Sequence, residues 1–404
     1  MEDIAKRYPE ALHFHKGGKI EVKARRSLET ERELSLAYTP GVAVPVEVIR
    51  KDPLKAFEYT SKGHLVAVIS NGTACLGLGN VGALACKPVM EGKAVLFKKF
   101  ANIDAFDIEV NEKDPDKFVE IVKAIAPTFG GINLEDIRAP ECFRIEERLK
   151  AELDIPVMHD DQHGTALISA AALINAVELT NKKMENLKVV VIGAGAAATS
   201  CTRIYKSLGV QEVVMFDSRG VIHNGRDDLN EIKKEFAIDT HYKSYKEALK
   251  GADVLLGLSK ADLIDGDDIM EMNVHPMVFA MSNPVPEIMP EVAKVARPDV
   301  LMATGRSDYP NQINNVLGFP YIFKGALRVR ASCINEPMKL AAAYALAELA
   351  RKEVPHELSV AYGRKLVFGE EYLIPSAFDP RLNEFVSIAV AKAAVESQVS
   401  RLPL

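Results

Sequence analysis

Cysteine is scarce in this chain of 404 residues and never occurs in closely spaced pairs. The five cysteines are Cys75, Cys86, Cys142, Cys201 and Cys333. No two of them form a Cys-x-x-Cys motif, so the pattern argues against a disulfide framework. We expect buried thiols in a reducing compartment, which predicts a cytoplasmic location.

Long apolar segments and an excess of positive charge are also missing. No stretch reaches the roughly 18 uncharged apolar residues of a membrane span. The amino terminus carries Glu2 and Asp3 and has no apolar core of signal-peptide length. The 50 lysines and arginines are outnumbered by 56 acids, which gives a formal net charge of −6. We therefore expect no membrane or nucleic-acid partner, and an anionic small molecule would need a local pocket of cations or a metal ion.

The chain is longer than one hydrophobic core usually supports, so two domains are expected. A polar region up to about residue 60 contains one charged helical stretch, residues 27–36, and strand and helix patterns then alternate. The expected strands are 64–70, 93–97, 105–110, 131–134 and 155–158, and the expected helices are 114–126 and 139–152. Such alternation predicts an α/β fold whose parallel sheet is covered by helices.

A glycine-rich turn begins the second half of this pattern. The strand 187–192 is followed by Gly193-x-Gly195-x-x-Ala198, which opens a helix, and the next strand ends in Asp217. The glycines allow a tight turn and close approach of a pyrophosphate to the helix amino terminus, while the acid can accept from a ribose hydroxyl. We expect a Rossmann domain, with strands at 187–192, 212–217, 253–257, 278–281 and 299–302.

Similar strand-helix units occur on both sides of residue 163, which makes the expected helix 165–179 the connection between the domains. The predicted domains are a substrate- and metal-binding domain of residues 1–162 with 317–404, and a Rossmann domain of residues 163–316. The helices expected at 338–352 and 383–397 would return the chain to the first domain. A cleft between domains is a common place for a small-molecule site.

Two pairs of acids stand where predicted strands end. Glu135-Asp136 follows the strand 131–134, and Asp160-Asp161 follows the strand 155–158. If these strands are neighbours in a parallel sheet, the four carboxylates converge at one edge of it. Such a set suits a hard divalent cation, Mg²⁺ or Mn²⁺, better than zinc. We predict Glu135, Asp136 and Asp161 as the ligands.

Two histidines, His159 and His163, bracket the second acid pair and leave a zinc site as an alternative. A spacing of four places two histidines on one face only within a helix, and residues 159–165 have the pattern of a turn. We therefore interpret both histidines as structural residues or as groups that support the metal ligands.

A nicotinamide site beside a hard-metal site is an informative combination. A 2-hydroxy acid can chelate the metal through its hydroxyl and carboxylate and lose a hydride to the nicotinamide. If the resulting ketone carries a β-carboxylate, the metal can stabilise the enolate that loss of CO₂ leaves. This chemistry needs a proton acceptor for the alcohol and a proton donor for the enol. The residues thus predict a metal-assisted hydroxy-acid dehydrogenase.

Several short motifs occur in a fixed order from about residue 15 to the end of the chain. They are Ala37-Tyr-Thr-Pro-Gly41, Leu76-Gly-Leu-Gly-Asn80, Gly92-Lys93, Leu134-Glu-Asp136, His159-Asp-Asp-Gln-His-Gly-Thr-Ala166, Ile192-Gly-Ala-Gly195, Ser282-Asn-Pro284 and Asn314-Asn315. Together they resemble the malic enzyme family, in its short prokaryotic form without a fused acyltransferase domain. The resemblance implies oxidative decarboxylation of malate to pyruvate with reduction of NAD(P).

The resemblance also implies catalytic roles. Lys93 matches the general base, Tyr38 the general acid for the enol, and Asp160 an acid that tunes the lysine. A lysine base must be neutral, so burial or the charge of the metal has to destabilise its ammonium. The implied binding residues are Asn283 and Asn315 for the substrate carboxylate, Glu135, Asp136 and Asp161 for the metal, and Gly193, Gly195, Ala198, Asp217 and Asn283 for the cofactor.

One feature of the family is absent. Larger members place an arginine for the substrate carboxylate in the loop after the first strand, whereas residues 71–75, Asn-Gly-Thr-Ala-Cys, supply none. The shorter forms share this lack. Asn71, Thr73 and Arg306 are candidate substitutes.

The cofactor and the products leave alternatives open. Asp217 would repel a 2′-phosphate and favours NAD, yet Ser218 and Arg219 could bind that phosphate if the acid turned away. We predict NAD, with NADP as the alternative. A malolactic-type enzyme that releases lactate would use the same site, and a nucleotide-binding protein without turnover would keep only the fold. The charged region before the first strand is the expected contact of a homodimer or larger homo-oligomer.

Overall fold

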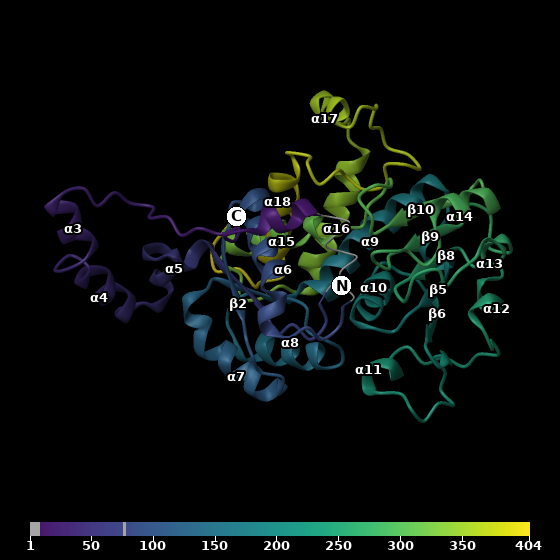
Figure 1. The fold of residues 1–404 in the computed structure, drawn as a ribbon, viewed down its shortest axis with the longest axis horizontal. Coiled ribbons are helices and arrows are strands. Elements are labelled where there is room, and N and C mark those ends of the chain that lie inside the picture. The colour runs from purple at the N-terminus through teal and green to yellow at the C-terminus, as the bar shows by residue number, and fades with distance from the viewer. Residues whose placement is uncertain (1–8, 76–77) are drawn as a thin grey trace.

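Two parallel β-sheets, each flanked by helices, make up most of the protein (Figure 1). The structure is a computed structural model that describes residues 9–75 and 78–404. Leu76 and Gly77 of the motif at 76–80, and the acidic start of the chain, therefore lie outside the described residues. The expected α/β class with parallel sheets is confirmed. The residue boundaries of the two domains stay a prediction.

The first sheet has four parallel strands in the order β2-β1-β3-β4. The strands are β1 (Leu65–Ser70), β2 (Asp104–Glu109), β3 (Gly131–Leu134) and β4 (Val157–His159). Helices α7 (Pro115–Ile125) and α8 (Glu141–Glu152) pack on one face of the sheet, and α6 (Ala83–Leu96) and α15 (Phe319–Arg328) pack on the other. Because both faces are covered, every residue of β1 is buried.

The second sheet has six strands in the order β10-β9-β8-β5-β6-β7, which are parallel except for the short β7. The strands are β5 (Lys188–Ile192), β6 (Glu212–Asp217), β7 (Gly220–Val221), β8 (Val254–Gly257), β9 (Met277–Ala280) and β10 (Leu301–Thr304). Its helices are α10 (Ala196–Ser207), α11 (Glu231–Lys234), α12 (Tyr245–Leu249), α13 (Gly266–Met270) and α14 (Pro290–Ala296). The sequence pattern did not reveal β7, which is only two residues long.

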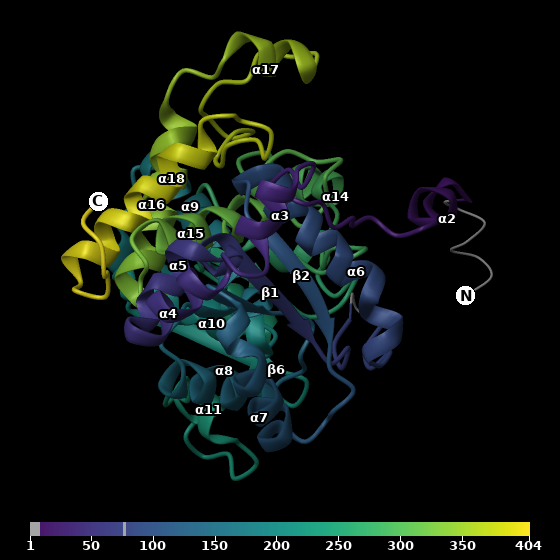
Figure 2. The same ribbon diagram turned by 90° about the vertical axis from the view of Figure 1, so that its left-hand side faces the viewer.

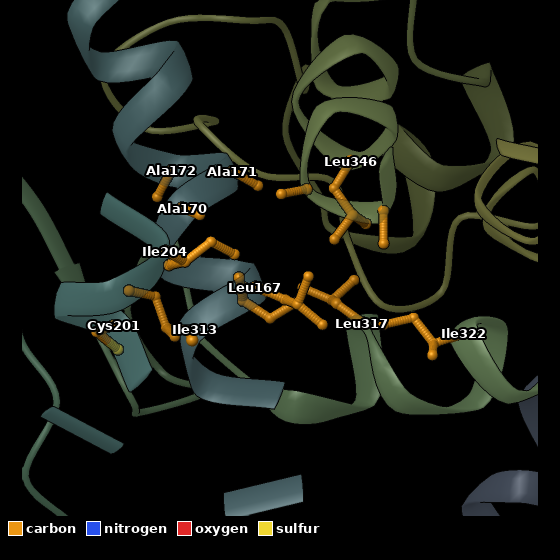
Figure 3. Close-up of a cluster of buried hydrophobic side chains, with 14 of the residues drawn as sticks. Leu167, Ala170, Ala171, Ala172, Cys201, Ile204, Ile313, Leu317, Ile322 and Leu346 are labelled. Carbon is orange, nitrogen blue, oxygen red and sulfur yellow. The ribbon is translucent and has the colours of Figure 1, made fainter. Parts of the chain in front are cut away.

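A long buried helix, α9 (Asp160–Leu179), joins the two sheets and is the centre of the main core. Leu167 and the small residues Ala170, Ala171 and Ala172 let α10 on one side and α16 (Glu336–Arg351) on the other approach closely (Figure 3). The helices α15 and α16 pack against α18 (Leu382–Glu396), and α17 (His356–Ala361) lies in a protruding loop (Figure 2). The carboxyl-terminal helices thus return to the first sheet and to α9.

Two helices near the amino terminus lie apart from this body. Helices α3 (Glu31–Ala37) and α4 (Ala43–Lys51) form an arm that projects away from the first sheet (Figure 1). None of their residues is buried, and Leu34, Leu36, Val44 and Val46 are exposed. The remaining elements of the region are α2 (Pro9–His15), η1 (Pro53–Lys55), α5 (Ala56–Tyr59) and η2 (Ser61–His64). Apolar groups that the chain itself leaves uncovered are typical of a contact surface.

Two expectations are wrong. Residues 93–97 are not a strand: they end α6 and begin the π-helical turn η3 (Phe97–Ala101), because Cys86, Met90 and Ala94 follow helical spacing into the core. Residues 159–165 are not a turn either, since α9 begins at Asp160 and His159 is its N-cap residue. The other expected elements are present: the strands 131–134 and 212–217 have the predicted bounds, and the rest have shifted ends. In the described part of the chain, no helix combines the length and the apolar character needed to cross a membrane.

Candidate active site

Three carboxylates converge where β3 and β4 end. These strands are neighbours, so Glu135 and Asp136, which follow β3, lie beside Asp161 in the first turn of α9. One oxygen from each of the three side chains lies within 4.8 Å of the others. The backbone N–H of Asp136 also donates to Asp161 Oδ2 at 2.7 Å. The fold therefore brings together the three residues that were predicted to bind a metal.

The donor set fits a hard divalent cation. All three donors are carboxylate oxygens, the ligands that Mg²⁺ and Mn²⁺ prefer. Burial raises the pKa of Glu135 well above its usual value; Lys93 opposes this, and the neighbouring acids add to it. A bound cation would therefore relieve the cost of ionising these groups together. Among the described residues this is the only such ligand group, and it includes neither His159 nor His163.

Lys93 projects from the last turn of α6 toward the same acids. Its Nζ lies 2.7 Å from Asp160 Oδ2, 2.9 Å from Glu135 Oε1, and 4.4 Å from the centre of the Phe319 ring. Burial alone would lower the pKa of Lys93, but the charges of Asp160 and Glu135 outweigh it and hold the pKa above its ordinary value. The lysine is thus a buried ammonium shared by two carboxylates.

Asp160 is fully buried, and Gly164 lies one helical turn after it. A Cβ at Gly164 would lie 2.2 Å from Asp160 Oδ1 and 2.9 Å from Asn315 Cγ, so this position requires glycine. Asn315 accepts from the Thr165 hydroxyl at 3.1 Å, and its amide nitrogen lies 3.5 Å from the backbone carbonyl of Asp160. The first turn of α9 therefore links Lys93 to Asn315.

The glycine-rich turn after β5 has the geometry of a pyrophosphate cradle. Gly193 has a φ of 116°, and a Cβ there would lie 2.2 Å from the Leu258 carbonyl oxygen. A Cβ at Gly195 would meet no atom within 4 Å, which leaves open space before α10. Ala198 is buried. The turn from Gly193 to Ala198 thus has the shape that a bound pyrophosphate needs, and its role in binding a dinucleotide stays a prediction.

Asn283 lies at the same end of the second sheet, in the loop after β9. A Cβ at Gly305, after β10, would lie 2.6 Å from Asn283 Nδ2, so the two loops are in close contact. The Asn283 amide makes one long hydrogen bond, at 3.5 Å, to the carbonyl oxygen of Met281. Its role toward substrate or cofactor stays a prediction.

Asp217 stands at the end of β6, where the sequence predicts a ribose-binding acid. Its carboxylate is occupied, however, by Arg226 at 2.8 and 3.0 Å and by Lys233 at 2.6 Å. Burial alone would raise the pKa of Asp217, but these hydrogen bonds lower it to about 2. Sequence reasoning did not single out either cation.

Comparison with known proteins agrees with this arrangement. The family model for the malic enzyme N-terminal domain matches residues 17–150, and the model for the malic enzyme NAD-binding domain matches residues 162–361. The chain belongs to the malic enzyme family.

Individual relatives within the malic enzyme family extend over nearly the whole chain. An NADP-dependent malic enzyme of Rhizobium meliloti is 54% identical over 98% of this chain, which spans only 53% of that protein. A bifunctional malic/malolactic enzyme of Bacillus subtilis is 50% identical over 97% of this chain and 94% of its own length. The crystal structure of malic enzyme from Pyrococcus horikoshii is similar with a TM-score of 0.90 and 46% identity, covering 98% of this chain and 93% of that one.

Tyr38, which matches the general acid of malic enzymes, is not part of the cluster around Lys93. It is the residue that ends α3 on the projecting arm, and 69% of it is exposed. The fold of this chain thus brings Lys93 and Asp160 together but leaves Tyr38 exposed at the end of α3.

The three candidates for holding a substrate carboxylate are already engaged. Asn71 donates to the Glu112 carbonyl at 3.2 Å and accepts from the Thr73 hydroxyl at 2.7 Å. Arg306 is paired with Asp308. These partners would have to be exchanged before any of the three could bind a substrate carboxylate.

One buried acid of the site was missed. Glu146 of α8 accepts from the backbone N–H of His159 at 3.2 Å, the amide of Gln162 at 3.3 Å and the ring Nε2 of His163 at 2.9 Å. Burial would raise the pKa of Glu146, yet His163 and other basic groups keep it below the usual range. One carboxylate thus anchors the first turn of α9.

His163 links this anchor to the carboxyl-terminal helices. Burial lowers its pKa, and its neutral ring donates from Nε2 to Glu146 while Nδ1 accepts from Lys339 at 3.3 Å. His159 lies 3.3 Å from Asp161 Oδ2. One signal could have revealed Glu146: it is the single acid on the buried face of α8 that Cys142, Ile145 and Leu149 define.

Proposed function

We propose that this protein catalyses the oxidative decarboxylation of (S)-malate to pyruvate and CO₂ with reduction of NAD(P), and that it requires a divalent cation. One observation carries the proposal. Lys93 Nζ lies 2.7 Å from Asp160 and beside three convergent carboxylates. This group stands at the amino-terminal end of α9, the helix that leads into the dinucleotide domain. The matches to the malic enzyme family support it.

The proposed site has residues for malate, for a divalent cation and for the dinucleotide. Glu135, Asp136 and Asp161 would hold Mg²⁺ or Mn²⁺, and the turn from Gly193 to Ala198 would hold the dinucleotide. When bound, the nicotinamide accepts the hydride and the cation polarises the C2 oxygen and stabilises the enolate. The Asn283 and Asn315 amides donate to the substrate carboxylate and orient C2.

Lys93 takes the proton of the C2 hydroxyl, and Asp160 keeps its Nζ in place. Only a neutral lysine can do this, whereas two carboxylates hold Lys93 as an ammonium. Use of Glu135 as a metal ligand would leave the lysine one carboxylate partner instead of two. Its buried position would then lower its pKa toward the working range.

Tyr38 protonates C3 of the enol, and we propose that it comes from a second copy of the chain. The arm that carries it leaves Leu34, Leu36 and Val44 uncovered and projects away from the first sheet (Figure 1), and Tyr38 itself is exposed. Docking of the arm on a second copy would bury these apolar groups and complete the site there. This gives the expected homodimer a chemical reason.

An assay with malate and Mn²⁺ tests the reaction. We expect NAD(P)H and pyruvate to form in equal amounts, with no product after exhaustive chelation. The name of the Bacillus subtilis relative favours one alternative, a malolactic reaction. Lactate as the product without net formation of reduced cofactor would establish that alternative and overturn the main proposal.

A further inference from the structure

A buried carboxylate joins two loops at the carboxyl-terminal edge of the second sheet. Glu287 is only 1% exposed and lies in the segment after β9. Its Oε1 accepts from the backbone N–H of Ser259 at 2.7 Å, and its Oε2 accepts from the backbone N–H of Ser282 at 3.1 Å. Ser259 follows β8 and Ser282 follows β9, so one side chain fixes the loops after two neighbouring strands.

The surroundings of Glu287 explain why an acid stands there. Burial raises the pKa of Glu287, and in the described part of the chain the groups that oppose this are backbone N–H donors rather than cations. A buried carboxylate is costly unless hydrogen bonds replace its hydration. What the carboxylate provides is geometric, because its two oxygens each accept from a different loop, whereas a glutamine amide offers only one acceptor oxygen.

The end of β8 leaves room for this carboxylate. A Cβ at Gly257, the last residue of β8, would lie 2.7 Å from Glu287 Cδ, so a side chain there would displace the carboxyl group. The backbone N–H of Ile264 donates to the Glu287 carbonyl at 2.9 Å, and that of Met281 donates to the Gly257 carbonyl at 3.0 Å. The carboxylate thus has a fixed place between the two loops.

Both loops lie on the side of the pyrophosphate cradle where the nicotinamide half of a dinucleotide is expected. The cradle follows β5, and the adenosine ribose is expected at the end of β6, which pairs with β5 on one side. The other half would then extend over β8 and β9, on the other side of β5. The loop after β8 contacts the cradle, since a Cβ at Gly193 would lie 2.2 Å from the Leu258 carbonyl oxygen. The loop after β9 carries Asn283, which is exposed.

We propose that Glu287 is a positioning residue for the nicotinamide ring, which holds the loops after β8 and β9 together so that both contact the ring. It acts through these loops and not through contact with the cofactor. This inference rests on the proposed function, because it assumes a dinucleotide on the turn from Gly193 to Ala198. Loss of the carboxylate should weaken binding of the nicotinamide half and leave binding of the adenosine half as it is.

Binding of the reduced cofactor tests the proposal without malate or metal. ADP-ribose is NADH without the nicotinamide ring, so calorimetric titrations with NADH and with ADP-ribose separate the two halves. NADPH and 2′-phospho-ADP-ribose serve in the same way if the protein uses NADP. The fluorescence of bound NADH also reports the surroundings of the ring itself.

Glu287→Gln keeps the size of the side chain but leaves one backbone N–H without an acceptor. We expect NADH to bind about 10-fold more weakly, the scale of one unsatisfied buried donor. Most of the fluorescence change on binding should be lost, whereas ADP-ribose should bind as it does to the unaltered protein. The KM for malate should also rise, because Asn283 follows Ser282 in the released loop.

Two further variants complete the test. Gly257→Ala keeps the acid but displaces it, since the added Cβ would meet Glu287 Cδ at 2.7 Å, and it should show the same selective loss. Glu291→Gln is the matched control. Glu291 is an exposed acid of α14 that accepts from the Tyr309 hydroxyl at 2.6 Å, and this variant should bind both nucleotides normally.

A role in stability alone would lower the affinities for NADH and ADP-ribose together. An equal loss for both nucleotides in Glu287→Gln and Gly257→Ala would therefore overturn the proposal. Unchanged binding and fluorescence of NADH in both variants would also overturn it, as would an unaltered protein that binds neither nucleotide. A failure of the proposed reaction would be seen separately, because malate oxidation could be absent while NADH and ADP-ribose still bind.

Discussion

At the scale of single residues, Lys93 is the side chain on which the proposed reaction depends most. Lys93→Ala should lower kcat by about 100-fold or more, the usual scale for loss of a general base. Lys93→Arg should be equally impaired, because a guanidinium keeps the charge but does not give up its proton. Steady-state assays and cofactor titrations measure both effects, and Lys117→Ala on the exposed side of α7 is the control. A near-normal rate in Lys93→Arg would rule out a base role.

Glu146 has a different role, since it holds α9 without contacting the proposed substrate site. Glu146→Gln keeps the size of the side chain but places an amide against the donors His163 and Gln162. We expect the free energy of unfolding to fall by about 1–3 kcal/mol, the cost of leaving buried donors unsatisfied. Urea denaturation of the metal-free protein measures it. The neighbouring exposed residue gives the control, Glu147→Gln, which should change stability by less than about 0.5 kcal/mol.

The two kinds of residue differ in how far the sequence predicts them. The proximity of Glu135, Asp136 and Asp161 could be predicted from the sequence, because acids at the ends of neighbouring parallel strands share one sheet edge. The burial of Glu146 could be predicted from its place on the apolar face of α8, but its partners could not, because they are reached only through the packing of α8 against α9. The same holds for Arg226 and Lys233, whose contacts with Asp217 depend on the path of the loop after β7.

At the scale of elements, both wrong expectations concern short segments that contain a glycine or directly follow one. Residues 93–97 have the apolar character of a strand, and Gly92 resembles a strand boundary, but α6 continues through Gly92 because β1 already pairs directly with β2. Gly164 likewise suggests a turn within residues 159–165. The lack of a side chain at Gly164 instead makes room for Asn315 and for the Asp160 carboxylate. This requirement comes from tertiary packing and cannot be seen in the local sequence.

Substitution of Gly164 should affect activity much more than stability. Gly164→Ala raises intrinsic helix propensity by about 1 kcal/mol, yet the added Cβ would meet Asp160 Oδ1 at 2.2 Å and must displace it. We expect a loss of kcat/KM of about 100-fold, as for misplacement of a reacting group by about 1 Å. The melting temperature should change little by comparison.

Gly92→Ala is the matched control for that variant. Gly92 also lies within a helix and precedes Lys93, but a Cβ there meets only Lys19 Nζ at an ordinary 3.6 Å. It should keep normal activity. If Gly164→Ala were as active as Gly92→Ala, the packing of the first turn of α9 would not control the geometry of Asp160.

At the scale of the whole molecule, the acids where the first sheet meets α9 link metal binding to stability. Removal of divalent cations by a chelator should abolish malate oxidation, and Mn²⁺ or Mg²⁺ should restore it. The same cations should raise the melting temperature, because a ligand that binds only the folded state stabilises it and here also reduces repulsion among buried carboxylates. Thermal scans with and without Mn²⁺ measure this effect. Asp161→Asn should reduce it, and an unchanged response in that variant would place the cation elsewhere.

The projecting arm makes the number of chains per active site measurable. If Tyr38 acts on the site of a second copy, a mixed dimer of Tyr38→Phe and Lys93→Ala chains contains one site with both residues intact and one site that lacks both. Each variant alone should be severely impaired. After they are unfolded and refolded together in equal amounts, about a quarter of the unaltered activity should return, since half of the dimers are mixed and each has one working site. An arm that folded back onto its own chain would leave every site with one defect, so mixing would restore nothing.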